Sequence, residues 1–83
     1  MCRNITTLRG LEPPATPDEV EAAARQYVRK VSGVQSVSAA TSEAFERAVR
    51  EVTAATAALL ASLPPRKQPP TTEPPLRRIA RRA

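Results

Sequence analysis

The chain has 83 residues, a net charge of +5, one tyrosine, one phenylalanine and no tryptophan. This length allows one small domain, and no apolar run approaches the roughly 20 residues that a membrane-spanning helix needs. With a single cysteine and no histidine, the chain offers neither an internal disulfide nor a complete zinc site, so we expect no metal and no cofactor.

The N-terminal segment, residues 1–15, has no regular helical period. Its start lacks the apolar region of a signal peptide, and a lone cysteine is typical of reducing compartments, so we expect a cytoplasmic protein. Ile5, Leu8 and Leu11 are apolar, and we expect them to cover the apolar face of the helix that follows.

The first helix is predicted over about residues 17–32. Thr16 and Glu19 have the spacing of a capping box, Pro17 suits the first helical position, and Gly33 is suited to end the helix. Apolar residues at steps of three and four predict one buried face, made of Val20, Ala23, Ala24, Tyr27, Val28 and Val31. An isolated helix of this length is not stable in water, so this face needs a cover.

The second helix is predicted over about residues 39–62. It begins between Ser38 and Ser42, with Ser38 or Thr41 as its cap, and the Pro-Pro pair at 64–65 stops it. Its apolar face contains Phe45, Ala48, Val49, Val52, Ala55, Thr56, Leu59, Leu60 and Leu63. Two such helices joined by a short linker favour an antiparallel hairpin, and we expect both aromatic residues, Tyr27 and Phe45, in its core.

The tail, residues 64–83, holds the excess positive charge. It has six basic residues against one acidic residue, a net charge of +5, whereas residues 12–62 have five against seven, a net charge of −2. Three Pro-Pro pairs favour an extended chain without a core, so we predict a tail that is mostly disordered. Its last eight residues separate apolar from basic positions in helical spacing, but they are too few for a stable free helix.

Several runs of residues form a recognisable pattern: Met1-Cys2-Arg3-Asn4-Ile5, Leu8, Pro13-Pro14-Ala15-Thr16, Gln26-Tyr27-Val28-Arg29-Lys30, Ser32-Gly33, Ser38, Ala44-Phe45 and Ala48-Val49. This pattern resembles a family of small bacterial proteins known only as a domain of unknown function. The resemblance covers about residues 1–63 and leaves the tail outside. It implies a folded module without implying an activity.

Two groups of residues are candidates for chemistry or binding. The N-terminal candidate cluster is Cys2, Arg3 and Asn4, in which a neighbouring arginine favours the thiolate of a cysteine. No histidine is present to activate that thiol, so we favour a cysteine that is simply packed or exposed. The binding candidates are the basic residues of the tail, Arg66, Lys67, Arg77, Arg78, Arg81 and Arg82.

The sequence therefore predicts an all-α protein. A helical module over residues 1–63, an antiparallel two-helix hairpin with an N-terminal covering segment, precedes a mostly disordered Pro/Arg-rich tail over residues 64–83. We interpret it as a non-enzymatic binding module whose hairpin docks a protein partner or itself. In this interpretation the basic tail contacts nucleic acid or an acidic surface. Two alternatives stay open: a cysteine-dependent redox or transfer function at the N-terminus, and a purely structural subunit of an oligomer, a homo-oligomer among them.

Overall fold

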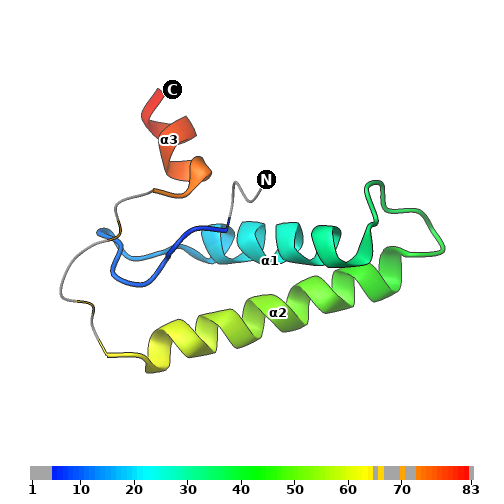
Figure 1. The fold of residues 1–83 in the computed structure, drawn as a ribbon, viewed down its shortest axis with the longest axis horizontal. Coiled ribbons are helices and arrows are strands. Elements are labelled where there is room, and N and C mark those ends of the chain that lie inside the picture. Colours follow the sequence, from blue (N-terminus) through cyan, green and yellow to red (C-terminus); the bar gives the residue numbers. More distant parts are fainter. Residues whose placement is uncertain (1–4, 65, 67–69, 71–72, 83) are drawn as a thin grey trace.

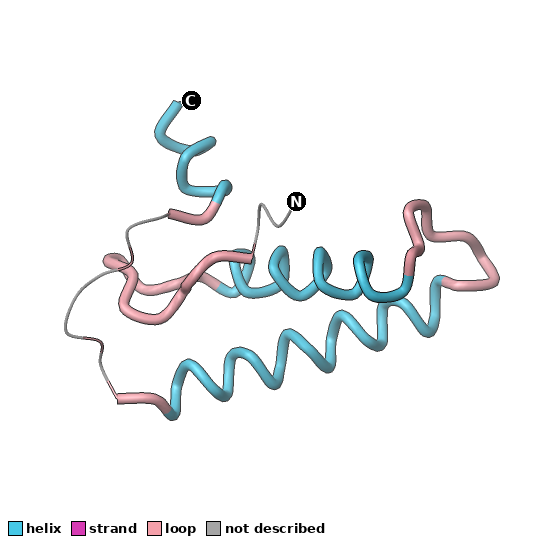
Figure 2. The backbone as a smooth tube through the Cα atoms, viewed as in Figure 1, coloured by secondary structure: helices cyan, strands magenta, loops and turns pink. Residues whose placement is uncertain are grey.

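The computed structural model describes residues 5–64, 66, 70 and 73–82, and these contain three helices and no strand. The helices are α1 (Pro17–Ser32), α2 (Ser42–Ser62) and α3 (Pro75–Arg82). Figures 1 and 2 show α1 and α2 side by side in opposite directions, with the N-terminal segment crossing near the start of α1. The predicted all-α hairpin is confirmed.

The first helix begins and ends through local contacts that the sequence predicts. The backbone N–H of Thr16 donates to Glu19 Oε1 at 2.8 Å, and the N–H of Glu19 donates to Thr16 Oγ1 at 3.2 Å. This reciprocal pair is the capping box. At the other end Gly33 has a φ of 73°, and its N–H donates to the Arg29 carbonyl at 3.0 Å. The left-handed conformation at Gly33 ends the helix.

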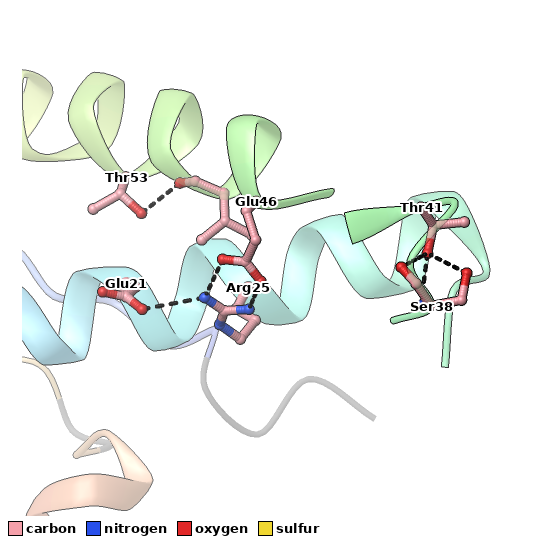
Figure 3. A network of polar contacts seen from close by, with 7 residues as sticks. Glu21, Arg25, Ser38, Thr41, Glu46 and Thr53 are labelled. Atoms are coloured by element: carbon pink, nitrogen blue, oxygen red, sulfur yellow. Dashed lines mark hydrogen bonds and ion pairs between the residues drawn. The ribbon is translucent and has the colours of Figure 1, made fainter. Parts of the chain in front are cut away.

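The second helix begins at Ser42, at the later end of the predicted range between Ser38 and Ser42. A turn precedes it, in which the N–H groups of Thr41 and Ser42 both donate to the Ser38 carbonyl, at 3.2 and 2.8 Å. Thr41 is the N-cap by position, but its hydroxyl accepts from the Ser38 N–H at 3.0 Å and makes no cap hydrogen bond to α2 (Figure 3). Ser38 and Thr41, the two candidate caps, thus hydrogen-bond to each other, and α2 begins only after this turn.

Two small apolar clusters hold the helices together. The first contains Ala24 and Val28 of α1 with Phe45 and Val49 of α2. The second brings the N-terminal segment onto the hairpin, with Leu8, Leu11 and Val20 buried against Ala15 and Leu60. The predicted cover by Leu8 and Leu11 is therefore confirmed.

The apolar faces of both helices are wider than the surfaces that cover them. Tyr27, predicted in the core, is about half exposed, and so is Leu59, while Ile5 is also exposed. The prediction for Tyr27 is wrong because a layer of two helices covers only the centre of each apolar face. Phe45 sits at that centre and is buried as expected.

A charged clamp spans the two helices on one side of the core. Arg25 of α1 donates to Glu46 Oε2 at 2.8 Å and Oε1 at 2.9 Å, and it also donates to Glu21 Oε2 at 3.3 Å (Figure 3). Its guanidinium carbon lies 5.8 Å from the centre of the Phe45 ring. Hydrogen bonding to Glu46 raises the pKa of Arg25, and the same bonds lower the pKa of Glu46. This bidentate contact between Arg25 and Glu46 fixes the register of the two helices.

Candidate functional site

The tail is attached to the hairpin through a buried carboxylate, Glu19. This residue is 4% exposed and is the one buried charged side chain among the described residues. Arg77 Nε donates to Glu19 Oε2 at 2.8 Å, and Arg77 Nη2 lies 3.3 Å from Glu19 Oε1. The same Nη2 donates to the carbonyls of Pro13 and Pro14, the second at 3.0 Å. We call this set of contacts the tail anchor.

The local sequence explains why the tail anchor forms where it does. Glu19 lies in the first turn of α1, held there by its bond to the backbone of Thr16. Pro13 and Pro14 cannot continue a helix, so their carbonyl groups remain available to a donor. On the tail side, the N–H of Arg77 donates to the carbonyl of Pro74, which is itself buried, at 3.1 Å. The planar guanidinium can then serve a carboxylate and two carbonyls at once.

Two opposing effects set the protonation of Glu19. Burial by itself raises the pKa of this carboxyl. The hydrogen bonds from Arg77 and from the Thr16 backbone, together with the positive charge of Arg77, outweigh burial and bring the pKa below the ordinary value of 4.5. Glu19 is therefore ionised at neutral pH and paired with Arg77 across 58 residues of chain.

A second set of contacts holds the start of the tail against the N-terminal segment. Arg9 donates through Nε and Nη2 to the Pro64 carbonyl, at 3.1 and 2.8 Å. Next to it, Gly10 has a φ of 88°, and a Cβ placed there would lie 2.8 Å from the Cβ of Arg66. Glycine is required at this position both for its backbone conformation and for the close approach of the tail.

The tail contains a third helix, in the C-terminal stretch that the sequence analysis finds too short for a stable free helix. Residues 75–82 form α3, which is possible for so short a segment because Arg77 and Pro74 pack it onto the hairpin. Residues 65, 67–69, 71–72 and 83 lie outside the described part of the chain.

The structure gives the predicted binding residues of the tail different surroundings. Arg77 is engaged in the tail anchor, and Arg66 lies against Gly10. Arg78, Arg81 and Arg82 belong to α3. Lys67 lies outside the described residues, as does the N-terminal candidate cluster of Cys2, Arg3 and Asn4. The proposals for these residues stay predictions.

The sequence analysis missed Glu19 as a partner of the tail. Its position marked it as a capping residue, and nothing in the local pattern distinguishes Arg77 from the other tail arginines. Over the residues that the structure describes, no three His, Cys, Asp or Glu side chains gather into a set that could hold a metal ion. In that same part of the chain, none of the helices has the length and apolar character needed to cross a membrane.

Comparison with models of protein families gives a match for this chain. The model of a family described as an uncharacterized conserved protein (DUF2277) matches residues 1–83. The match includes the tail, which corrects the expectation that the family resemblance ends near residue 63. No curated protein and no solved structure matches this chain.

Proposed function

Because this chain belongs to the uncharacterized conserved protein family DUF2277 over residues 1–83, and that family carries no described activity, we propose a function from structure and charge. The protein is a non-enzymatic binding module. Its hairpin is a scaffold that presents α3, and the arginines of α3 contact the phosphates of a nucleic acid.

The separation of charge carries this proposal. The tail contains six basic residues and one acidic residue, while residues 12–62 have a net charge of −2. Positive charge is therefore concentrated at one end of the chain. Arginine suits phosphate because its planar guanidinium donates two parallel hydrogen bonds. Arg78, Arg81 and Arg82 are spaced by three and four residues, which places them on one side of a helix.

The tail anchor supports a presenting role for α3. Arg77 donates its hydrogen bonds to Glu19 and to the Pro13 and Pro14 carbonyls, and these bonds fix the first turn of α3 against the hairpin. A basic helix that is already ordered loses less conformational entropy on binding than a disordered segment does. Arg77 is therefore a positioning residue in this proposal, and the other arginines of α3 make the contacts.

The test is binding of the full chain to a labelled single-stranded RNA and a DNA duplex, followed by fluorescence anisotropy over a salt series. We expect binding at low salt that weakens linearly on a log–log plot as salt rises. The full-chain variant R78Q/R81Q/R82Q should lose at least tenfold in affinity and have a shallower salt slope.

The matched control removes three positive charges from exposed residues of the hairpin, as R29Q/K30Q/R47Q. It should bind nearly as well as the wild type. Equal losses in the two triple variants, or no binding at low salt, would refute the proposal. Binding to polyglutamate without binding to RNA or DNA would also refute it and would point to an acidic protein partner.

A further inference from the structure

An apolar groove runs along one side of the hairpin, and nothing in the described part of the chain fills it. It has a volume of about 340 Å³. Its lining includes no charged residue and comes from the N-terminal segment, α1 and α2: Ile5, Thr6, Leu8, Ala23, Ala24, Tyr27, Val52, Thr56 and Leu60. We propose that a second copy of this chain covers this groove, so that two hairpins pack face to face as a four-helix dimer.

The apolar surface around the groove continues along α2. Leu59 follows Val52 by seven residues and Thr56 by three, so it lies on the same side of the helix, and Leu63 extends that side by one more turn. From Val52 to Leu63 the chain has no charged residue. A helix that is apolar on most sides is normally buried against another element.

The exposed area is of the size that a dimer needs. Ile5, Tyr27, Leu59 and Leu63 are 41, 48, 55 and 38% exposed. For side chains of this size, these fractions amount to roughly 300 Å² of apolar surface. A stable dimer buries about 800 Å² on each partner, of which roughly 60% is apolar. Four residues therefore supply more than half of the apolar area for one side of such an interface.

The thin core favours a second copy as the occupant. The two clusters together bury seven apolar residues among those that the structure describes, and Phe45 is the one aromatic residue in them. Small domains with so little core gain stability by association. Because the groove and the end of α2 carry no charge, two copies with a net charge of +5 can meet there without burying an unpaired charge.

The protein's own α3 is a poor candidate for the same groove. Its anchoring residue Arg77 is bound to Glu19, and Figure 1 shows α3 on the side of α1 that faces away from α2. Packing two hairpins face to face produces four helices around one core, which is a common solution for amphipathic helix pairs. The interface would be isologous, with the same residues contributed by each copy.

The experiment is sedimentation equilibrium of the full chain from about 1 to 200 μM, together with Tyr27 fluorescence. Tyr27 is the one tyrosine and no tryptophan is present, so its emission reports on the groove. We expect a dimer at the upper concentrations and a change in Tyr27 emission along the same concentration curve. L59E should weaken dimerisation at least tenfold, while circular dichroism shows that it retains its helix content.

The matched control is A58E, which places the same charge at an exposed position of α2 on the side of the helix opposite to the groove. It should dimerise within twofold of the wild type. A monomer over the whole range, or equal weakening by L59E and A58E, would overturn the proposal. It would also be overturned if the chain stayed monomeric while Tyr27 emission responded to a peptide of residues 73–83, because the groove would then receive α3.

Discussion

Replacing Arg77 by methionine is expected to destabilise the hairpin, although Arg77 lies in the tail. Methionine retains most of the apolar stem but removes the hydrogen bonds to Glu19 and to the Pro13 and Pro14 carbonyls. Breaking a buried ion pair costs about 3–5 kcal/mol, and a hydrogen bond to a charged group is worth about 1.5–3 kcal/mol. Because water can reach Glu19 once the guanidinium is gone, we expect a loss near the lower values, about 2 kcal/mol.

For a chain of this size, a loss of about 2 kcal/mol lowers the Tm by about 10 °C. The measurement is urea and thermal unfolding of the full chain, followed by circular dichroism at a helical wavelength, for the wild type, R77M, E19Q and the double variant. If the two side chains stabilise each other, the double variant loses about 1–2 kcal/mol less than the sum of the single losses. R47M is the matched control, since Arg47 is an exposed arginine on α2.

Two results would refute this reasoning. One is an R77M protein whose unfolding free energy stays within about 0.5 kcal/mol of the wild type, or equals that of R47M. The other is additivity of R77M and E19Q within about 0.3–0.5 kcal/mol, because independent sites behave in this way. Either result would mean that the tail anchor contributes little to the fold.

The remaining predictions concern pH and three other positions. The pKa of Glu19 is lowered in the folded state, so the stabilisation that its carboxylate provides is complete above the ordinary pKa and is lost as pH falls through the folded-state pKa. The difference in unfolding free energy between the wild type and R77M should therefore narrow at about pH 3, as measured by urea unfolding. G33A should lower the unfolding free energy by about 1 kcal/mol, because alanine is strained at the positive φ of this position. G10A should show a larger loss of stability in thermal unfolding, because its new Cβ also meets Arg66. Equal losses in the two variants would contradict this contact. T6V should leave stability unchanged or raise it by up to about 1 kcal/mol, because the buried Thr6 hydroxyl has no hydrogen-bond partner among the described residues; a clear loss in urea unfolding would show that it has one.

The parts of this fold that depend on near neighbours could be predicted from the sequence. The capping box at Thr16 and Glu19 and the helix end at Gly33 follow from spacings of a few residues, and the apolar period fixes which faces of the two helices meet. The start of α2 lies at the later end of the predicted range because Ser38 and Thr41 bind each other in a turn, and two adjacent caps give no local signal for that choice.

The contacts of the tail could not be predicted in this way. Glu19 and Arg77 are 58 residues apart, and the proline-rich stretch between α2 and α3 indicates a break in the fold. Each residue also has a sufficient local explanation, one as a cap and the other as a solvated charge. The exposure of Tyr27 escaped prediction for another reason, because periodicity shows which side of a helix is apolar but not how much of that side a partner covers.

The Glu19 carboxylate binds both the backbone at the start of α1 and Arg77 of α3, so it makes the stability of these two segments cooperative. Its Oε1 accepts from the backbone N–H of Thr16, where α1 starts, and Arg77 donates to Oε2 and, over a longer distance, to Oε1 as well. Fraying at the start of α1 and release of α3 are therefore coupled openings, which amide hydrogen exchange would record with similar protection. A chain cut after residue 63 would lose the counter-charge of a buried carboxylate as well as a tail, so its behaviour would not be that of the intact hairpin.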